Sequence, residues 1–328
     1  MPVAARCADP GTVRIGIGVG SEVVGTPMAP QQVVAQAQDA EVAGFPAAWT
    51  VHFSRGIDAL TVLGAAGQRT SRIDLGVGVV PTYPRHPHAL AQQAATIQAL
   101  CAGRLTLGVG VSHRPVIEGL FGLPYAGPAA HMRDYLSVLV PLLRDGSVTH
   151  RGETYAVDGG FVVPGTSPVS VLVGALAPRM VAVAGELADG VVTWLAGPRS
   201  LEGRIGPRLR AAAHAAGRPA PRVVAAVAVA VCADPDAARS AAATVFARYQ
   251  GLANYQRQLA REDVTSVADL AVVGDGDAVA RQLASYVQAG ATEIWAVPFP
   301  VDSDGDAVAR TRRVLADIVS TRAPVGTA

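Results

Sequence analysis

The chain has 328 residues, of which 50% are hydrophobic and 16% charged, and its formal net charge at pH 7 is +1. A nearly neutral chain lacks the basic surface expected of a nucleic-acid or membrane-surface binder, so small molecules are the expected partners. The sequence contains no lysine, which excludes a Walker A loop and a Schiff-base lysine. This length and hydrophobic content predict one globular domain over residues 1–328.

The three cysteines, Cys7, Cys101 and Cys232, lie far apart and form no C-x-x-C pair. This pattern argues against a disulfide scaffold or a zinc ribbon, and we expect apolar filler in a reducing compartment. The first ten residues contain no continuous apolar stretch, and no later run is long enough to cross a bilayer. The expected location is therefore the cytoplasm.

Short β-branched runs alternate with longer Ala-rich segments along the chain. Strands are predicted at residues 13–19, 47–51, 73–80, 105–109, 169–175, 190–194, 223–231 and 292–297. Helices are predicted at residues 30–43, 57–69, 88–100, 129–143, 178–187, 201–216, 237–249 and 307–320. Eight strand–helix pairs favour a closed barrel over a doubly wound sheet, so the predicted fold class is α/β, a (β/α)8 TIM barrel with insertions in the βα loops.

Two stretches interrupt this alternation. Residues 145–163 alternate in polarity and contain glycines, which predicts a β-hairpin and a candidate part of a lid. Residues 251–275 look helical with breaks. They are either an insertion that shapes one wall of a pocket or plain peripheral packing.

Histidines follow three predicted strands, at the end of a barrel where catalytic groups lie. His52 follows the second strand, His86 the third and His113 the fourth. An imidazole with a pKa near 6.5 can deliver or remove the proton that accompanies a hydride, so His52 and His113 are the candidate catalytic residues. For each, a hydrogen-bonded structural imidazole is an equally good interpretation. His86 and His88 would need further ligands to hold a metal, and no metal is predicted.

Glycines and a helix start supply candidate cofactor contacts. In Gly108-Val109-Gly110 and Gly76-Val77-Gly78 the missing Cβ atoms would let a ring or phosphate approach the backbone, although neither is a full G-x-G-x-x-G motif. Residues 175–179, Ala175-Leu176-Ala177-Pro178-Arg179, lead from a strand into a helix. Free N–H groups, the helix dipole and Arg179 would suit an anionic cofactor tail there, and an ordinary βα turn fits equally well.

Four further pieces of sequence stand out: Gly44-Phe45 with Trp49 and His52, residues 81–87 (PTYPRHP), Gly103-Arg104-Leu105 before Gly108-Val109-Gly110, and Ala188-Asp189-Gly190. With these pieces the chain resembles the luciferase-like flavin- or F-420-dependent oxidoreductases, particularly the branch that includes methylene-tetrahydromethanopterin reductases and F-420-dependent glucose-6-phosphate dehydrogenase. The resemblance covers nearly the whole chain.

The resemblance implies a barrel that receives a deazaflavin ring at the strand C-termini and holds its phosphate with the fourth and fifth βα loops. Gly108, Gly110 and residues 175–179 match those loops. It also implies a non-proline cis peptide within Val77, Gly78 and Val79, and a homodimer.

The same resemblance bears on the two histidines. His52 matches a histidine near the reactive carbon of the cofactor, and His113 stands where the sugar-phosphate branch has an acidic proton donor, which leaves the substrate open. Val51 replaces an Asp that the family often has before the histidine. The pKa of His52 is therefore expected to be low.

The predicted function is hydride transfer between deazaflavin C5 of coenzyme F-420 and a small organic substrate with a C=C, C=N or C=O bond, in either direction. His52 or His113 would handle the proton. Phe53, Tyr83, Trp194 and Phe121 are candidate lining of a substrate pocket, or core residues. Arg85 and Arg114 are either anion contacts or solvated surface.

Two alternatives stay open, and a third is disfavoured. The two open alternatives are an FMN-dependent luciferase-like monooxygenase and a non-catalytic cofactor- or ligand-binding barrel. A nicotinamide-dependent Rossmann dehydrogenase is disfavoured by the incomplete glycine motif.

Overall fold

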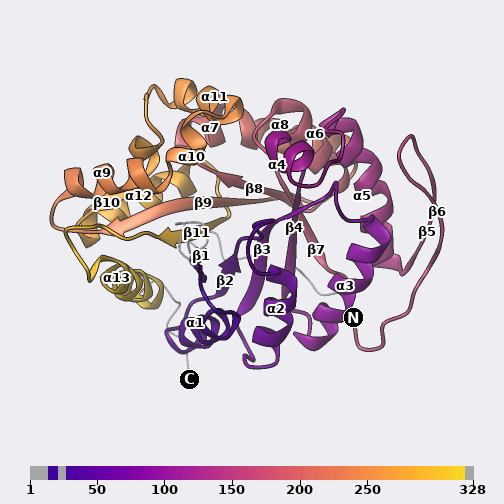
Figure 1. The fold of residues 1–328 in the computed structure, drawn as a ribbon, viewed down its shortest axis with the longest axis horizontal. Coiled ribbons are helices and arrows are strands. Elements are labelled where there is room, and N and C mark those ends of the chain that lie inside the picture. Colours follow the sequence, from indigo (N-terminus) through magenta and orange to yellow (C-terminus); the bar gives the residue numbers. More distant parts are fainter. Residues whose placement is uncertain (1–13, 21–26, 322–328) are drawn as a thin grey trace.

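A computed structural model describes residues 14–20 and 27–321. Eight parallel strands form a closed barrel with helices around it (Figure 1). The barrel strands are β1 (Arg14–Gly18), β2 (Ala47–Thr50), β3 (Asp74–Pro81), β4 (Leu105–Gly110), β7 (Ser170–Gly174), β8 (Gly190–Trp194), β9 (Arg222–Val231) and β11 (Glu293–Pro298). Strand β9 pairs with both β8 and β11, which closes the ring and confirms the predicted (β/α)8 barrel.

Helices connect the strands on the outside of the barrel. The longer ones are α1 (Pro30–Val42), α2 (Ala59–Gly67), α3 (Pro87–Leu100), α5 (Pro128–Asp145), α6 (Pro178–Leu187), α8 (Gly206–Ala215), α9 (Pro235–Val245), α11 (Ala253–Glu262), α12 (Gly276–Gln288) and α13 (Ala307–Thr321). Short pieces are α4 (Arg114–Gly119), α7 (Pro198–Ser200), a π-turn (Leu201–Ile205), α10 (Ala247–Gln250), a 3-10 turn (Val267–Leu270) and β10 (Val272–Gly274). Several begin with proline, whose fixed φ and missing N–H suit a first helical turn. No described helix is both long and apolar enough to cross a membrane.

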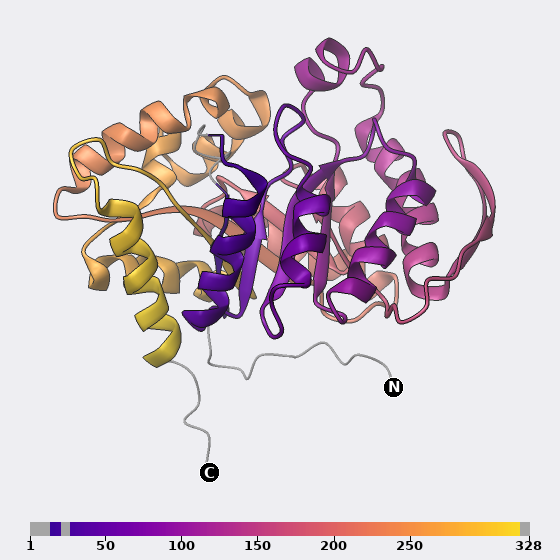
Figure 2. The same ribbon diagram turned by 60° about the horizontal axis from the view of Figure 1, so that its bottom comes forward.

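The predicted hairpin is confirmed by β5 (Ser147–Arg151) and β6 (Ala156–Gly160), which pair antiparallel. Figure 2 shows it outside α5, away from the barrel strands. Asp134 of α5 accepts hydrogen bonds from the N–H groups of Thr154 and Tyr155 at 2.6 and 2.9 Å, and this holds the hairpin tip to the helix. The Tyr155 ring also lies 5.3 Å from the ring of His86. The hairpin thus reaches the loop after β3 through its tip.

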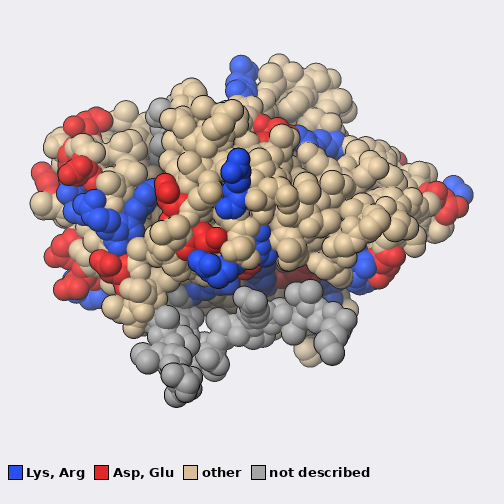
Figure 3. Space-filling view, turned by 90° about the horizontal axis from the view of Figure 1, so that it is seen from below, with Lys and Arg blue, Asp and Glu red and all other residues tan. Residues whose placement is uncertain are grey.

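Two neighbouring surface helices carry no charged residue. Neither α2 nor α3 contains Asp, Glu, Lys or Arg. The molecule shows a broad uncharged surface on this side (Figure 3). A groove of about 600 Å³ runs between the two helices, and Leu100 in its lining is 45% exposed.

Two stacked indoles fill the centre of the barrel. The rings of Trp49 and Trp295 lie 5.4 Å apart with an interplanar angle of 22°. Cβ atoms added at Gly16 or Gly76 would come within 3.0 Å of Trp49, and one at Gly78 within 3.0 Å of Trp295. Real side chains do not approach so closely, so glycine on β1 and β3 makes room for the indoles. Elsewhere in the core, Cys101 and Cys232 are buried free thiols, as predicted, whereas Cys7 lies outside the described residues.

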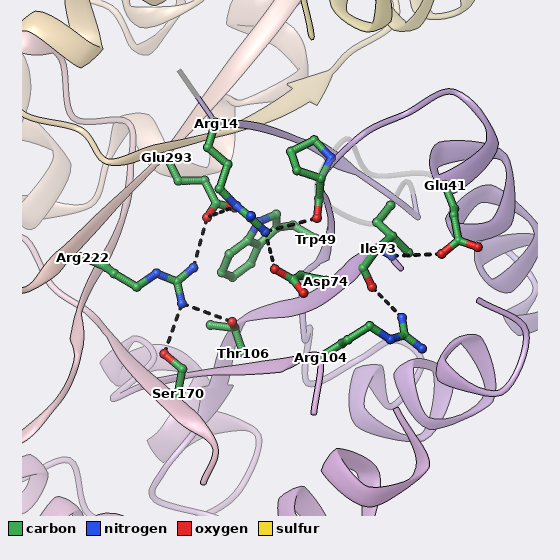
Figure 4. Close-up of polar contacts among 11 residues, drawn as sticks. Arg14, Glu41, Trp49, Ile73, Asp74, Arg104, Thr106, Ser170, Arg222 and Glu293 are labelled. Atoms are coloured by element: carbon green, nitrogen blue, oxygen red, sulfur yellow. Dashed lines mark hydrogen bonds and ion pairs between the residues drawn. The ribbon is translucent and has the colours of Figure 1, made fainter. Parts of the chain in front are cut away.

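A buried ionic network closes the N-terminal end of the barrel (Figure 4). Glu293, 2% exposed, accepts hydrogen bonds from Arg14 Nε and Arg222 Nη2, both at 3.0 Å, and from Trp49 Nε1 at 2.7 Å. Arg222 also donates to side chains at the starts of β4 and β7. Because these residues tie together the starts of the strands, the opposite end is left for a functional site.

Candidate active site

The strand register brings the predicted site residues to the C-terminal end of the barrel. Thr50 of β2 pairs with Val77 of β3, and Val80 of β3 pairs with Val109 of β4. His52, two residues beyond Thr50, therefore lies at the same end of the barrel as the glycines that end β4. The predicted convergence of an imidazole and glycine backbone at one mouth is confirmed.

A bulge interrupts β3 at this mouth. The Gly78–Val79 peptide is cis, where the family resemblance placed one, and the register with β4 shifts between Val77 and Val80. The Val79 side chain extends from the bulge towards β4 and β7. A Cβ atom at Gly110 would come within 3.0 Å of Val79 Cγ2, and one at Gly174 would lie 3.2 Å from Val79 Cγ1.

Gly108 also makes room for this bulge, in this case for its backbone. A Cβ atom there would come within 3.0 Å of the Val77 carbonyl oxygen. The missing Cβ atoms at Gly108 and Gly110 thus make room for the bulge, which lies where the sequence predicted a ring or phosphate. Their direct contact with a cofactor, like that of the buried Val109, stays a prediction.

His52 is held at the start of α2. Its Nδ1 accepts a hydrogen bond from the Ala59 N–H at 3.4 Å, so the neutral ring carries its proton on Nε2. Burial lowers the pKa of His52; nearby Arg85 lowers it further, and Asp58 opposes the shift. The pKa of His52 is thus low, as expected from Val51, but the main cause is burial of the ring rather than the missing carboxylate.

Asp58 and Arg85 form an ion pair beside His52. Asp58 also caps α2 by accepting the Thr61 N–H at 2.8 Å. Arg85 is therefore neither a free anion contact nor a solvated surface residue. Arg114, the other arginine considered, pairs with Glu118 on α4.

The segment after α9 forms one wall of the mouth. The Arg248 guanidinium lies 5.1 Å from the centre of the Phe53 ring, beyond β2. Tyr249 approaches Trp194, the last residue of β8, edge-on at 5.9 Å. Both Arg248 and Tyr249 belong to α10, which precedes the predicted wall segment 251–275. Arg248 was missed from the sequence because nothing local links it to Phe53.

His113 meets the same wall from β4. Its ring lies 6.1 Å from that of Tyr255 on α11, and burial lowers its pKa. His113 precedes α4 as its N-cap residue but makes no side-chain capping hydrogen bond. Unlike His52, it is oriented by packing alone among the described residues.

Tyr83 belongs to an aromatic cluster rather than to an open pocket. Its ring stacks on His131 at 3.9 Å, and its hydroxyl donates to the Ala126 carbonyl at 2.7 Å. Burial raises the pKa of Tyr83 to about 12 and lowers that of His131 to about 4. His131 Nε2 also hydrogen-bonds Thr82 Oγ1 at 2.9 Å. Within residues 14–20 and 27–321, no group of three or more His, Cys, Asp or Glu residues could hold a metal.

The turn from β7 into α6 leaves a helix start open. Ala177 precedes the helix without a side-chain capping bond, and Pro178 and Arg179 are exposed. Ala175 is buried and Leu176 half-buried, so they support the turn from below. Backbone N–H groups, the helix dipole and a guanidinium are together suited to an anion.

The profile of the luciferase-like monooxygenase family matches residues 12–293 of the chain. The chain belongs to this family. Relatives include a Mycobacterium tuberculosis protein that is named only by inference as a coenzyme F-420-dependent oxidoreductase, 32% identical over 57% of this chain and 57% of the relative. An F-420-dependent glucose-6-phosphate dehydrogenase of Nakamurella multipartita is 31% identical over 64% of each chain. The matches thus span between half and two thirds of these relatives.

Solved structures share the luciferase-like fold at lower identity. The F-420-dependent tetrahydromethanopterin reductase of Methanopyrus kandleri superposes with a TM-score of 0.79 at 24% identity, covering 94% of this chain and 99% of that one. An F-420-dependent secondary alcohol dehydrogenase gives 0.76 at 19%, covering 95% and 99%. A monooxygenase of Streptomyces bottropensis gives 0.71 at 22%, covering 94% and 99%.

The mouth of this luciferase-like barrel is lined by apolar groups. Val51, Phe53, Val79 and Trp194 are partly buried and pack on the core that contains the two stacked indoles. Flat apolar walls with a few polar groups at the edge are typical of sites for aromatic ligands. The donor set, one half-buried imidazole with a free Nε2–H and one open helix start, suits a ring that carries an anionic tail.

Proposed function

We propose that the chain is an F-420-dependent oxidoreductase that transfers a hydride between deazaflavin C5 and a small organic substrate with a C=C, C=N or C=O bond. The observation that carries the proposal is the Val79 bulge at the mouth of the barrel, flanked by His52 and apolar walls. The F-420-dependent names of relatives that are 31 and 32% identical support it.

Each part of the cofactor has a matching surface. Val79, with Gly108, Val109 and Gly110 behind it, would support the flat ring, and the open start of α6 with Arg179 would hold the anionic tail. Bound there, F-420 supplies or accepts a hydride at C5. Apolar side chains such as Phe53 and Trp194 exclude water from the ring.

We assign to His52 the role of hydrogen-bond donor to the reacting bond. Its lowered pKa keeps the imidazole neutral at pH 7, and the Ala59 N–H on Nδ1 leaves Nε2–H as the donor. In this tautomer the neutral ring donates Nε2–H to the substrate oxygen or nitrogen and stabilises the negative charge that develops there during hydride transfer in either direction; the proton itself is exchanged with water. His113, which no hydrogen bond orients among the described residues, would shape the substrate side of the mouth.

The test is a titration of the purified protein with F-420 and with FMN, followed by turnover on a panel of ketones, imines and enones. We expect F-420 to bind and to be oxidised or reduced with substrate. His52→Gln should lower turnover by about 10²-fold or more with nearly unchanged F-420 affinity. His214→Gln, at an exposed position on α8, is the matched control.

Other results would contradict the proposal. Preferential binding of FMN with oxygen consumption would identify a monooxygenase. Tight F-420 binding without turnover on any substrate would identify a non-catalytic binding barrel. Unchanged turnover in His52→Gln would remove His52 from the mechanism.

We also propose that the enzyme is a homodimer that joins through the uncharged surface of α2 and α3. A two-fold axis would place the groove of one copy against Leu100 of the other. Sedimentation should give twice the chain mass for the wild type, and Leu100→Arg should give a monomer. Val42→Arg changes a residue that is 85% exposed on α1 and should stay dimeric. A monomeric wild type would contradict the interface.

A further inference from the structure

A second cavity lies beside the end of β1, between the barrel and α13. Its volume is about 250 Å³, which corresponds to about eight water molecules. Its walls are largely apolar and include Val51 and Val297. The polar groups that line it are the Trp295 indole, Gln36 and Arg312. Of these, Gln36 is engaged, because its Oε1 accepts the Gly20 N–H at 2.8 Å.

The Trp295 indole has an unused donor. The residue is 4% exposed, and its Nε1 has no hydrogen-bond partner among the described residues. The stacked Trp49, by contrast, donates its Nε1–H to Glu293. A Cβ atom at Gly18, which lines the cavity, would lie 3.3 Å from Trp295 Nε1. Glycine at position 18 thus leaves the space beside this N–H free of a side chain, and a buried donor without an acceptor indicates that a bound molecule supplies one.

Arg312 on α13 is a partly buried cation without a carboxylate partner. It donates one hydrogen bond, from Nη2 to the Gly18 carbonyl at 2.7 Å, and no described Asp or Glu lies within 4.0 Å of it. Asp39 acts on it only at longer range, and burial lowers its pKa. Arg310, on the same helix, is instead paired with Asp304. A guanidinium has five donors, so most of those of Arg312 remain available.

We propose that this cavity binds a small organic acid, whose carboxylate pairs with Arg312 and whose keto or hydroxyl oxygen accepts the Trp295 Nε1–H. The short carbon chain of the acid would lie against Val51 and Val297. Water alone could satisfy the indole, but it would leave the arginine unpaired. The cavity lies at the same end of the barrel as the mouth and shares Val51 with its lining. Acid binding there does not require F-420, so it goes beyond the proposed function and can be tested without the cofactor.

Binding of α-ketobutyrate, butyrate and butyramide to the cofactor-free protein tests the proposal, with tryptophan fluorescence and calorimetry as readouts. We expect α-ketobutyrate to bind most tightly and butyramide at least about tenfold more weakly, because it lacks the charge. Arg312→Gln should weaken both acids by about tenfold or more. Arg313→Gln, which removes an exposed charge from the next position of α13, should not.

The indole contact has its own test. Trp295→Phe keeps an aromatic ring but removes the N–H, so it should abolish the preference for α-ketobutyrate over butyrate while butyrate still binds. Calorimetry replaces fluorescence for this variant. An unchanged preference would overturn the role of Trp295.

Several results would overturn the acid site itself. One is that the acids bind equally well to the wild type and to Arg312→Gln, and another is that butyramide binds as tightly as the acids. The others are that inorganic phosphate binds the wild type as tightly as α-ketobutyrate does, or that neither acid binds the folded wild type. If Arg312→Gln does not fold, two measurements replace it. Arg312→Lys keeps the positive charge and should still bind the acids. The affinity of the wild type for the acids should fall as the salt concentration rises from about 0.05 to about 0.5 M, because salt screens the ion pair. Because F-420 is absent, these failures leave the proposed redox function untouched.

Discussion

Gly110→Ala tests how the mouth of the barrel is built. The added Cβ would come within 3.0 Å of Val79 Cγ2, well inside van der Waals contact. Overpacking of this kind costs about 1–3 kcal/mol in the free energy of unfolding. Because the colliding atom belongs to a side chain, Val79→Ala should remove the clash, and the two substitutions together should cost less than the sum of their separate effects.

Gly108→Ala is the matched contrast. Its Cβ would meet the Val77 carbonyl oxygen, which Val79→Ala does not move. Urea unfolding of both double-mutant cycles measures the coupling. We expect about 1–2 kcal/mol of rescue at Gly110 and additivity within about 0.5 kcal/mol at Gly108. Equal coupling in the two cycles, or none at Gly110, would refute the packing described for the bulge.

Three further predictions concern ionisable groups. The pKa of His131 in the folded protein is about 4, below its ordinary value of 6.5, so the free energy of unfolding should fall by about 2–3 kcal/mol as the pH drops from above 6.5 towards 4. His131→Phe should flatten this pH dependence in urea unfolding, and an equal loss in both proteins would contradict the prediction. Glu293→Gln removes the charge that pairs with Arg14 and Arg222, and we expect a loss of about 3 kcal/mol or more in thermal unfolding; a melting temperature within a degree of the wild type would refute that role. Because the neutral imidazole of His52 is the active form and protonation of Nδ1 would break its contact with the Ala59 N–H, kcat should decline only as the pH falls through a value below 6.5. A decline centred above 6.5 would exclude the imidazole described here.

The fold could be predicted because its signals are local. Strand β9 is a run of Val and Ala residues buried along nearly its whole length, as strands of a parallel sheet are, and the helix starts are marked by prolines. The hairpin could be predicted from alternating polarity and glycines. These features depend on neighbours in sequence, so periodicity alone identifies them.

The contacts of the site could be predicted only in part. The missing Cβ atoms at Gly108 and Gly110 make room for a close approach, as predicted. The groups that approach, however, belong to the neighbouring strand β3: the Val77 carbonyl at Gly108 and the Val79 side chain at Gly110. Tyr83 was placed at the mouth, yet its stacking on His131 depends on how α5 packs. Such contacts join segments far apart in sequence, and no local pattern encodes them.

Trp295 connects the mouth of the barrel with the acid cavity. A Cβ atom at Gly78 would come within 3.0 Å of Trp295 Cζ3, and Nε1 of the same indole faces Gly18 in the cavity lining. Trp49, held by Glu293 at the closed end, stacks on the indole and limits how far it can shift. A larger residue at position 78 must therefore displace either the bulge or the indole. It follows that Gly78→Ala should weaken α-ketobutyrate binding although it lies outside the cavity, and unchanged affinity in a folded Gly78→Ala protein would show that the two sites are independent.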